Sequence, residues 1–253
     1  MIGRSAPALH GQDFFERDPQ LTLLRRATAE AAGTFLLVFT VAASAIAASS
    51  LAPGVAGIAR ALAMGPTLTA LILAFGPISG GHFNPLITLA QWMTRQRPTS
   101  CLAAYIVAQL LGATMGAQLA FAAFASHPLT TAMASLLSQT VAEFIAAFGL
   151  MILVMSAPRM QPRGVGPFAV GGWIAMTLAG LPTSPAANPA ISLGLLMGAP
   201  ALVSGARAVL AHVGLQFFGM AAAMLLLSLI DPGPEASSKR ADSGELSGEQ
   251  HGV

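Results

Sequence analysis

Charged residues are scarce in this sequence, and their scarcity excludes most classes of protein. Asp, Glu, Lys and Arg make up 9% of the 253 residues, whereas apolar residues make up 55% and the mean hydropathy is +0.70. Soluble domains carry about 25% charged residues. The composition therefore excludes a water-soluble enzyme and, despite a pI of 9.3, a nucleic-acid-binding protein. It indicates an integral membrane protein.

Cysteine and acidic residues are also rare. Cys101 is the single cysteine, which excludes an intramolecular disulfide bond. Glu30 and Glu143 are the only acidic residues between positions 19 and 230. The sequence shows no Gly-rich phosphate loop, no catalytic triad and no His/Cys cluster with metal-ligand spacing. We therefore expect no enzyme activity, no cofactor and no metal site.

Long apolar runs are abundant. A helix that crosses a bilayer needs about 20 mostly apolar residues, and six such stretches are present, at about 27–49, 57–76, 101–125, 133–157, 165–181 and 205–230. Two shorter apolar runs, 85–94 and 189–197, cover only about half of a hydrocarbon core at about 1.5 Å per residue. No run alternates as the strands of a membrane barrel do. The sequence predicts an all-α membrane protein.

The Lys and Arg residues predict its orientation, because cytoplasmic loops carry an excess of positive charge. With six spans, the side that holds both termini carries ten of them: Arg4, Arg17, Arg25, Arg26, Arg95, Arg97, Arg159, Arg163, Lys239 and Arg240. The other side carries only Arg60 and Arg207. We expect both termini in the cytoplasm and, from the short loops, a multi-pass protein of a bacterial inner membrane.

The chain repeats its landmarks in one order. The first and fourth spans open on Ala-Glu, the short runs read NPLITL and NPAISL, and the third and sixth spans share Gln-x-x-Gly. Each half holds three full spans, an odd number, so the second half is inserted upside down relative to the first. The two short segments then meet near the midplane, where their polar backbone ends must line a cavity or water-filled path.

Both short segments begin at Asn-Pro, and this pair predicts polar groups at the centre of the path. Proline suits the first helical position, and the asparagine before it is a good N-cap. Asn84-Pro85 and Asn188-Pro189 therefore place two amides and two positive half-helix ends together. A neutral molecule can accept hydrogen bonds there, whereas a cation meets positive potential from both sides.

These residues resemble the aquaporins of the major intrinsic protein family over nearly all of 27–230. The resemblance is carried by Ala29-Glu30 with Gly33-Thr34-Phe35, the loop Gly76–Pro85, the Tyr105/Gln109/Gly112 pattern, Glu143 and Asn188-Pro189-Ala190. It implies six tilted helices and two re-entrant half-helices around one pore per protomer, in a homotetramer in the lipid bilayer. It also implies that Glu30 and Glu143 accept hydrogen bonds from the re-entrant loops, a role that competes with a proton relay.

His82, two residues before Asn84, is the third residue that we expect to support the loops. A lone histidine of this kind is usually packed or bonded to the backbone. Gating of the path by its titration is the alternative hypothesis.

Two positions depart from the family pattern. The first motif reads Asn84-Pro85-Leu86, where the family usually has alanine third, so Leu86 either crowds the midplane or packs behind it. The second motif, Asn188-Pro189-Ala190, is followed by Ile191, where the family normally has arginine in its outer filter. By spacing, the remaining filter residues are Met64, Pro185 and either Met176 or Thr177, depending on the length of the loop.

An apolar filter without a guanidinium loses up to five donors and a permanent charge. We expect a passive channel for small uncharged solutes: water, glycerol-type polyols and metalloid hydroxides such as arsenous acid. Cation exclusion is then left to the half-helix dipoles and the two asparagines. The alternatives are a water-selective channel, a secondary transporter, since transporters also use inverted repeats and broken helices, and a non-conducting structural member.

The domain division follows from these landmarks. We expect a cytoplasmic N-tail over 1–24 and a channel domain over 25–230, with repeats at about 27–125 and 133–230. The polar, Gly/Ser-rich segment 231–253 is predicted to be a disordered cytoplasmic C-tail.

Overall fold

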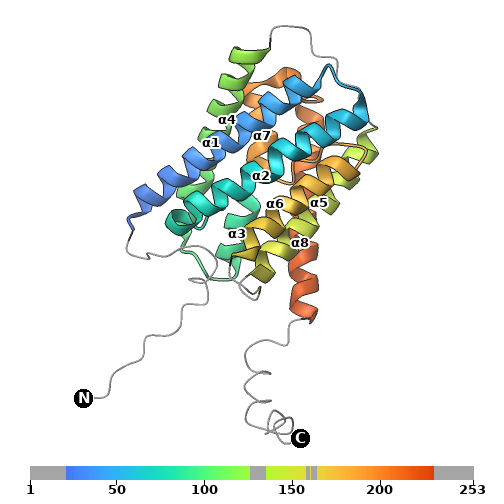
Figure 1. Ribbon diagram of the computed structural model, residues 1–253. Coiled ribbons are helices and arrows are strands. Elements are labelled where there is room, and N and C mark those ends of the chain that lie inside the picture. The colour runs from blue at the N-terminus through green and yellow to red at the C-terminus, as the bar shows by residue number, and fades with distance from the viewer. Residues whose placement is uncertain (1–20, 126–134, 158–159, 161–163, 231–253) are drawn as a thin grey trace, which may run out of the picture.

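The computed structural model describes residues 21–125, 135–157, 160 and 164–230, and within them it is helical without strands (Figure 1). The predicted C-tail and most of the predicted N-tail lie outside the described residues. Eight α-helices follow one another in the described part: α1 (Leu23–Ala48), α2 (Pro53–Ser79), α3 (Pro85–Met93), α4 (Thr99–Phe124), α5 (Leu136–Ser156), α6 (Val165–Gly180), α7 (Pro189–Gly198) and α8 (Ala206–Ile230). A short 3-10 turn, Pro200–Leu202, follows α7.

Five of these helices are long and apolar enough to cross a membrane: α1, α2, α4, α5 and α8. The sixth predicted span, 165–181, corresponds to α6, which has only 16 described residues. At about 1.5 Å per residue it is about 24 Å long, shorter than the hydrocarbon core. Large apolar side chains cover the outer surface, among them Leu62, Leu111, Leu137 and Phe218, each at least 60% exposed. This is the surface of a multi-pass membrane protein.

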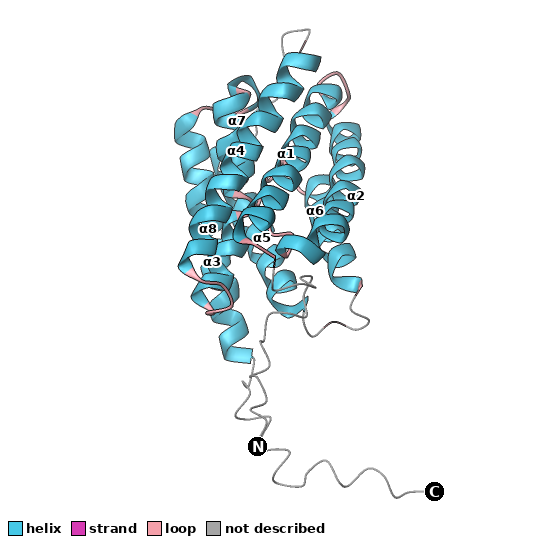
Figure 2. Ribbon diagram, turned by 90° about the vertical axis from the view of Figure 1, so that its left-hand side faces the viewer, coloured by secondary structure: helices cyan, strands magenta, loops and turns pink. Residues whose placement is uncertain are grey.

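The helices pack as two similar halves. In the first half α1 lies against α4, in the second α5 lies against α8, and α2 and α6 join the halves (Figure 2). Small residues allow the close approach: a Cβ atom on Gly112 of α4 would collide with the backbone oxygen of Ala31. At the matching place, a Cβ atom on Gly219 of α8 would lie 2.6 Å from the backbone oxygen of Phe144. Such glycines bring helix backbones into contact in membranes.

The short helices α3 and α7 lie toward opposite ends of the bundle, in both views (Figures 1 and 2). They have 9 and 10 residues, and both start at the proline of an Asn-Pro pair. The asparagine before each proline is extended, with φ of −151° at Asn84 and −157° at Asn188, because proline excludes the α region from its predecessor. The sequence therefore sets where both half-helices begin.

Candidate pore and selectivity filter

Asn84 and Asn188 meet at the centre of the bundle and bond to one another's loops. The Oδ1 atom of Asn84 accepts the Leu86 N–H at 3.0 Å, and that of Asn188 accepts the Ala190 N–H at 2.9 Å, so each caps its own half-helix. The Nδ2 atom of Asn84 donates to the Ala187 carbonyl at 3.0 Å, and that of Asn188 donates to the Phe83 carbonyl at 2.8 Å. Each side chain is thereby fixed at both ends.

Phe83 and Ala187, the residues before the two asparagines, were not singled out from the sequence. Both have positive φ values, 47° and 50°, in the left-handed region that non-glycine residues rarely adopt. This turn sends each carbonyl to the opposite asparagine and each N–H to a buried glutamate. Only the repeat could have pointed to them, because each directly precedes its Asn-Pro pair.

Glu30 is fully buried in α1 and holds the first re-entrant loop. Its carboxylate accepts four hydrogen bonds: from Ser79 Oγ at 2.7 Å, His82 N at 3.0 Å, Phe83 N at 2.7 Å and Gln109 Nε2 at 2.8 Å. Four donors compensate a carboxylate that is removed from water. The loop therefore depends on a side chain that is 49 to 53 residues away in the sequence.

Glu143 occupies the matching place in α5. It accepts the N–H groups of Ala186 and Ala187 and the Nε2 atom of Gln216, each at 2.9 Å. Gln216 also donates to Ser192 at 3.0 Å, just as Gln109 donates to Thr88 at 3.0 Å in the first half. The same polar network is thus built twice around one axis.

His82 is 2% exposed and also belongs to the first loop. Its backbone N–H binds Glu30, and its Nδ1 atom lies 3.0 Å from Thr88 Oγ1. The Thr88 hydroxyl also lies 3.2 Å from the Asn84 carbonyl and accepts from Gln109 Nε2 at 3.0 Å. The ring is held by the half-helix, and gating through its titration stays a hypothesis.

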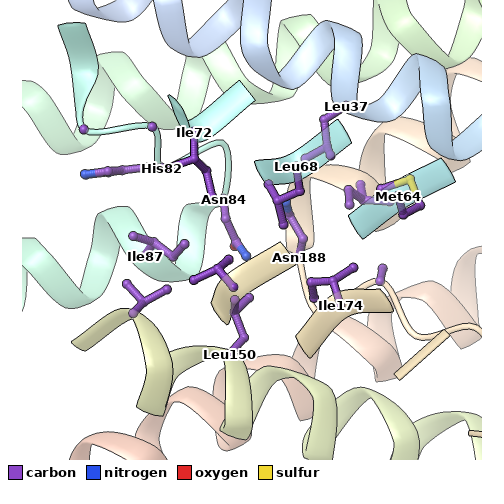
Figure 3. A pocket seen from close by; sticks show the side chains of 16 residues that line it. Leu37, Met64, Leu68, Ile72, His82, Asn84, Ile87, Leu150, Ile174 and Asn188 are labelled. Atoms are coloured by element: carbon purple, nitrogen blue, oxygen red, sulfur yellow. The ribbon is translucent and has the colours of Figure 1, made fainter. Parts of the chain in front are cut away.

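An elongated cavity runs past the two asparagines, with a volume of about 40 Å³ available to water-sized molecules. About 10–15 Å³ suffices for one water, so several waters fit. Its walls are apolar, and Figure 3 shows Met64 and His82 toward opposite ends with Asn84 and Asn188 between them. The lining residues are Leu37, Met64, Leu68, Ile72, Gly80, Gly81, His82, Asn84, Ile87, Leu150, Val154, Val170, Ile174, Ala186, Asn188 and Ile191. Most of the apolar wall was not predicted, although Met64, Leu68 and Ile72 recur every four residues on α2.

Of the five predicted filter residues, two line the cavity in the structure. Met64 and Ile191 line the cavity and are 4% and 5% exposed. The prediction that Met176 lies in the filter is wrong, because its side chain is 55% exposed on the outer face of α6. Thr177 is buried on the inner side, where its hydroxyl donates to the Ile174 carbonyl at 2.9 Å. Ile174, one turn earlier, lines the cavity in its place.

Neither Thr177 nor Pro185 lines the described cavity, although both are buried. Pro185 stands in the loop between Ser184 and Ala186, and Ala186 is the loop residue that reaches the cavity wall. From this loop, Ala186 and Asn188 line the described cavity.

Leu86, the unusual third residue of the first motif, is fully buried and packs in the core outside the cavity lining. We predict that Leu86→Ala lowers the stability by about 2–5 kcal/mol, since it leaves an apolar void, and keeps the solute preference of the wild type. Thermal unfolding in detergent and solute flux in vesicles measure the two effects. A changed solute preference would contradict packing behind the pore, and Leu89→Ala, a partly buried neighbour, is the control.

Within the described residues, no group of three or more His, Cys, Asp or Glu side chains is arranged to hold a metal ion. The polar atoms at the centre are amides, backbone groups and two carboxylates that are bonded to the loops. Such a site offers hydrogen bonds to a passing molecule and no nucleophile.

Comparisons with known proteins agree with this geometry. The family model described as major intrinsic protein matches residues 19–204. The aquaglyceroporin AqpS of Rhizobium meliloti is 35% identical over 178 residues, which cover 69% of this chain and 76% of that protein. Aquaporin Z of Brucella melitensis is 33% identical over 196 residues, 69% of this chain and 85% of that protein.

A solved structure, the aquaglyceroporin from Plasmodium falciparum, has the same fold, with a TM-score of 0.66 over 83% of this chain and 97% of that one, at 17% identity. Members of the matched family are channels and not enzymes. On the family model and the identity to its relatives, the chain belongs to the major intrinsic protein family.

Proposed function

We propose that this protein is a passive channel for small uncharged solutes, water and glycerol-type polyols among them, and is not an enzyme. The observation that carries the proposal is the apolar cavity with Asn84 and Asn188 at its centre. The names of the relatives, aquaglyceroporin and aquaporin, agree with it. A solute that passes the apolar walls exchanges hydrogen bonds with water for hydrogen bonds with the amides.

The same centre disfavours cations. The N-termini of α3 and α7 begin at the two asparagines, so the positive ends of both helix dipoles are directed to one place. The side-chain amides of Asn84 and Asn188 offer donors to a passing solute, because their Oδ1 atoms already accept the N–H groups that cap α3 and α7. A neutral solute with acceptor oxygens is therefore favoured over a cation of the same size.

The residues beside Met64 support a relaxed filter. Met64, Ile174 and Ile191 present apolar side chains to the cavity. A flexible thioether or aliphatic side chain can move aside for a bulky solute more easily than a rigid, hydrogen-bonded guanidinium can. We extend the proposal to glycerol-sized polyols and metalloid hydroxides such as arsenous acid. A water-selective channel that tolerates Ile191 is the second candidate, favoured by the small volume of the cavity.

A secondary transporter is the candidate from another class. Ion coupling needs a carboxylate or polar group that changes partners during transport, but Glu30 and Glu143 bind loop donors through both oxygens. A channel flux rises linearly with solute concentration and ignores proton or sodium gradients. A saturating flux that follows such a gradient would establish the transporter instead.

Topology and assembly belong to the same proposal. We infer that both termini lie in the cytoplasm, that the membrane is a bacterial inner membrane, and that four protomers assemble, each with its own pore. The excess of Lys and Arg on one side supports the orientation. The channel domain spans 25–230, with the polar segments 1–24 and 231–253 as tails.

The deciding variant is Ile191→Arg, tested in proteoliposomes after an osmotic shift. A guanidinium in the wall adds bulk and fixed donors, so glycerol and arsenous acid permeability should fall at least about tenfold, a change of about 1.4 kcal/mol in barrier, while water still passes. Ile191→Val is the matched control, because it keeps an aliphatic wall. If the wild type passes water alone, the relaxed filter is rejected; if it passes no neutral solute, the channel itself is rejected.

A further inference from the structure

We propose that Arg60 is the charge filter of this pore: its guanidinium, held by Ser184, repels cations at the end of the cavity beside Met64. The inference rests on the proposed channel function and names a residue that sets its selectivity. It also revises the expectation that cation exclusion is left to the half-helix dipoles and the two asparagines.

The position of Arg60 on α2 places it at the mouth. Met64, Leu68 and Ile72 line the cavity at intervals of four residues, and Arg60 stands four residues before Met64. Residues four apart lie one above the other on a helix face. Met64 is the α2 lining residue nearest the helix start, so Arg60 lies one turn beyond the described cavity, toward the outside.

A hydrogen bond fixes the side chain across the entrance. Arg60 Nη1 donates to Ser184 Oγ at 2.7 Å, between residues 124 apart in the sequence. Ser184 belongs to the second re-entrant loop, two residues before Ala186, which lines the cavity, and four before Asn188. The guanidinium therefore bridges α2 and the loop that carries one of the two central asparagines, and it is partly buried there.

The charge at this point is permanent. A guanidinium does not lose its proton in proteins, and apolar walls focus the field of a charge along a narrow path. The carboxylate that binds the same loop, Glu143 of α5, accepts the N–H groups of Ala186 and Ala187 and the Nε2 atom of Gln216. A cation that enters beside Met64 meets Arg60 first and the positive ends of α3 and α7 next.

The first test removes the charge and measures protons, which follow water through any open path. Arg60→Gln, reconstituted in vesicles with a pH-sensitive dye and an imposed potential, should raise the proton leak about tenfold, equivalent to about 1.4 kcal/mol, with glycerol and water flux in the same vesicles kept. Arg60→Lys should keep the leak low. Arg207→Gln, which removes an exposed arginine from the first turn of α8, is the matched control and should behave as the wild type.

An unchanged proton leak in Arg60→Gln, with neutral solutes passing, overturns the charge filter and leaves the channel proposal intact. A wild type that passes no neutral solute rejects the channel itself. An equal rise in Arg207→Gln would show that surface charge in general sets the leak, which also overturns the role of Arg60.

A second measurement separates charge from folding. Arg60→Cys places a thiol at the mouth, and the native Cys101 is fully buried. The same folded sample is treated with a methyl or an aminoethyl methanethiosulfonate, which add a neutral or a cationic group. The cationic group should lower the proton leak toward the wild-type level and the neutral one should not; the same leak with both groups overturns the proposal.

Discussion

Glu30→Ala is expected to abolish the folded channel. The substitution leaves Ser79 Oγ, the N–H groups of His82 and Phe83, and Gln109 Nε2 without their acceptor in the interior. Each buried donor without a partner costs about 1–3 kcal/mol. The His82 and Phe83 N–H groups lose this partner, while Ser79 Oγ keeps the Phe75 carbonyl at 3.4 Å and Gln109 Nε2 keeps Thr88, so the loss is a large part of the entire stability of a typical protein. The yield of monodisperse protein in mild detergent and its thermal unfolding measure the effect.

Two related variants are expected to lose less stability than Glu30→Ala. Glu30→Gln keeps one carbonyl oxygen and turns an NH₂ group toward donors, so it should be less damaging than alanine. Glu143→Ala removes one acceptor from three donors, of which Gln216 Nε2 keeps Ser192. Its loss of stability should lie between those of Glu30→Gln and Glu30→Ala. A Glu30→Ala protein that unfolds within a few degrees of the wild type would show that the loop does not depend on this carboxylate.

The second large effect is expected at the contact between α1 and α4. A Cβ atom on Gly112 would overlap the backbone oxygen of Ala31, and one on Gly116 would overlap that of Phe35. Backbone cannot move aside as a flexible side chain does, so Gly112→Val must push the two helices apart. The loss should exceed the about 1–3 kcal/mol usual for overpacked cores, again seen as lost monodisperse protein and early unfolding.

Gly214→Ala is the control for this variant. Gly214 also lies inside a helix, but a Cβ atom there meets nothing within 4 Å. Alanine has the higher helix propensity, by about 1 kcal/mol, so the control should be as stable as the wild type or slightly more stable. A Gly112→Val protein that matched Gly214→Ala would show that α1 and α4 do not need this close approach.

The sequence predicted the parts of the fold that depend on local chemistry. Apolar length indicated the five long helices, and Asn-Pro indicated the start of α3 and α7, since proline and its predecessor have few conformations. The inverted repeat made it reasonable to expect the two starts to meet. The family match and the fold of the Plasmodium aquaglyceroporin confirm this architecture.

What depends on tertiary context was not predicted. The choice between Met176 and Thr177 depends on which of them faces the pore. Neighbouring residues on a helix are about 100° apart, so an error of one residue in the spacing from Asn188 exchanges an inner for an outer side chain. The positive φ values of Phe83 and Ala187 have no local signal, because neither residue favours that region. Hydrogen bonds that these residues donate to distant glutamates and accept from distant asparagines impose it. From the sequence, Arg60 served only to predict the orientation of the chain in the membrane. Its hydrogen bond to Ser184 could not be predicted, because the two residues are 124 positions apart.

The crossed bonds of the two asparagines carry a consequence for biosynthesis. Asn84 is satisfied by a carbonyl of the second half, and Asn188 by a carbonyl of the first. Because the chain is synthesised from its N-terminus, Asn84 cannot make this hydrogen bond until Ala187, 103 residues later, has been added. The centre of the pore can therefore form only after both halves have been inserted, and its two crossed hydrogen bonds join the oppositely oriented halves into one protein.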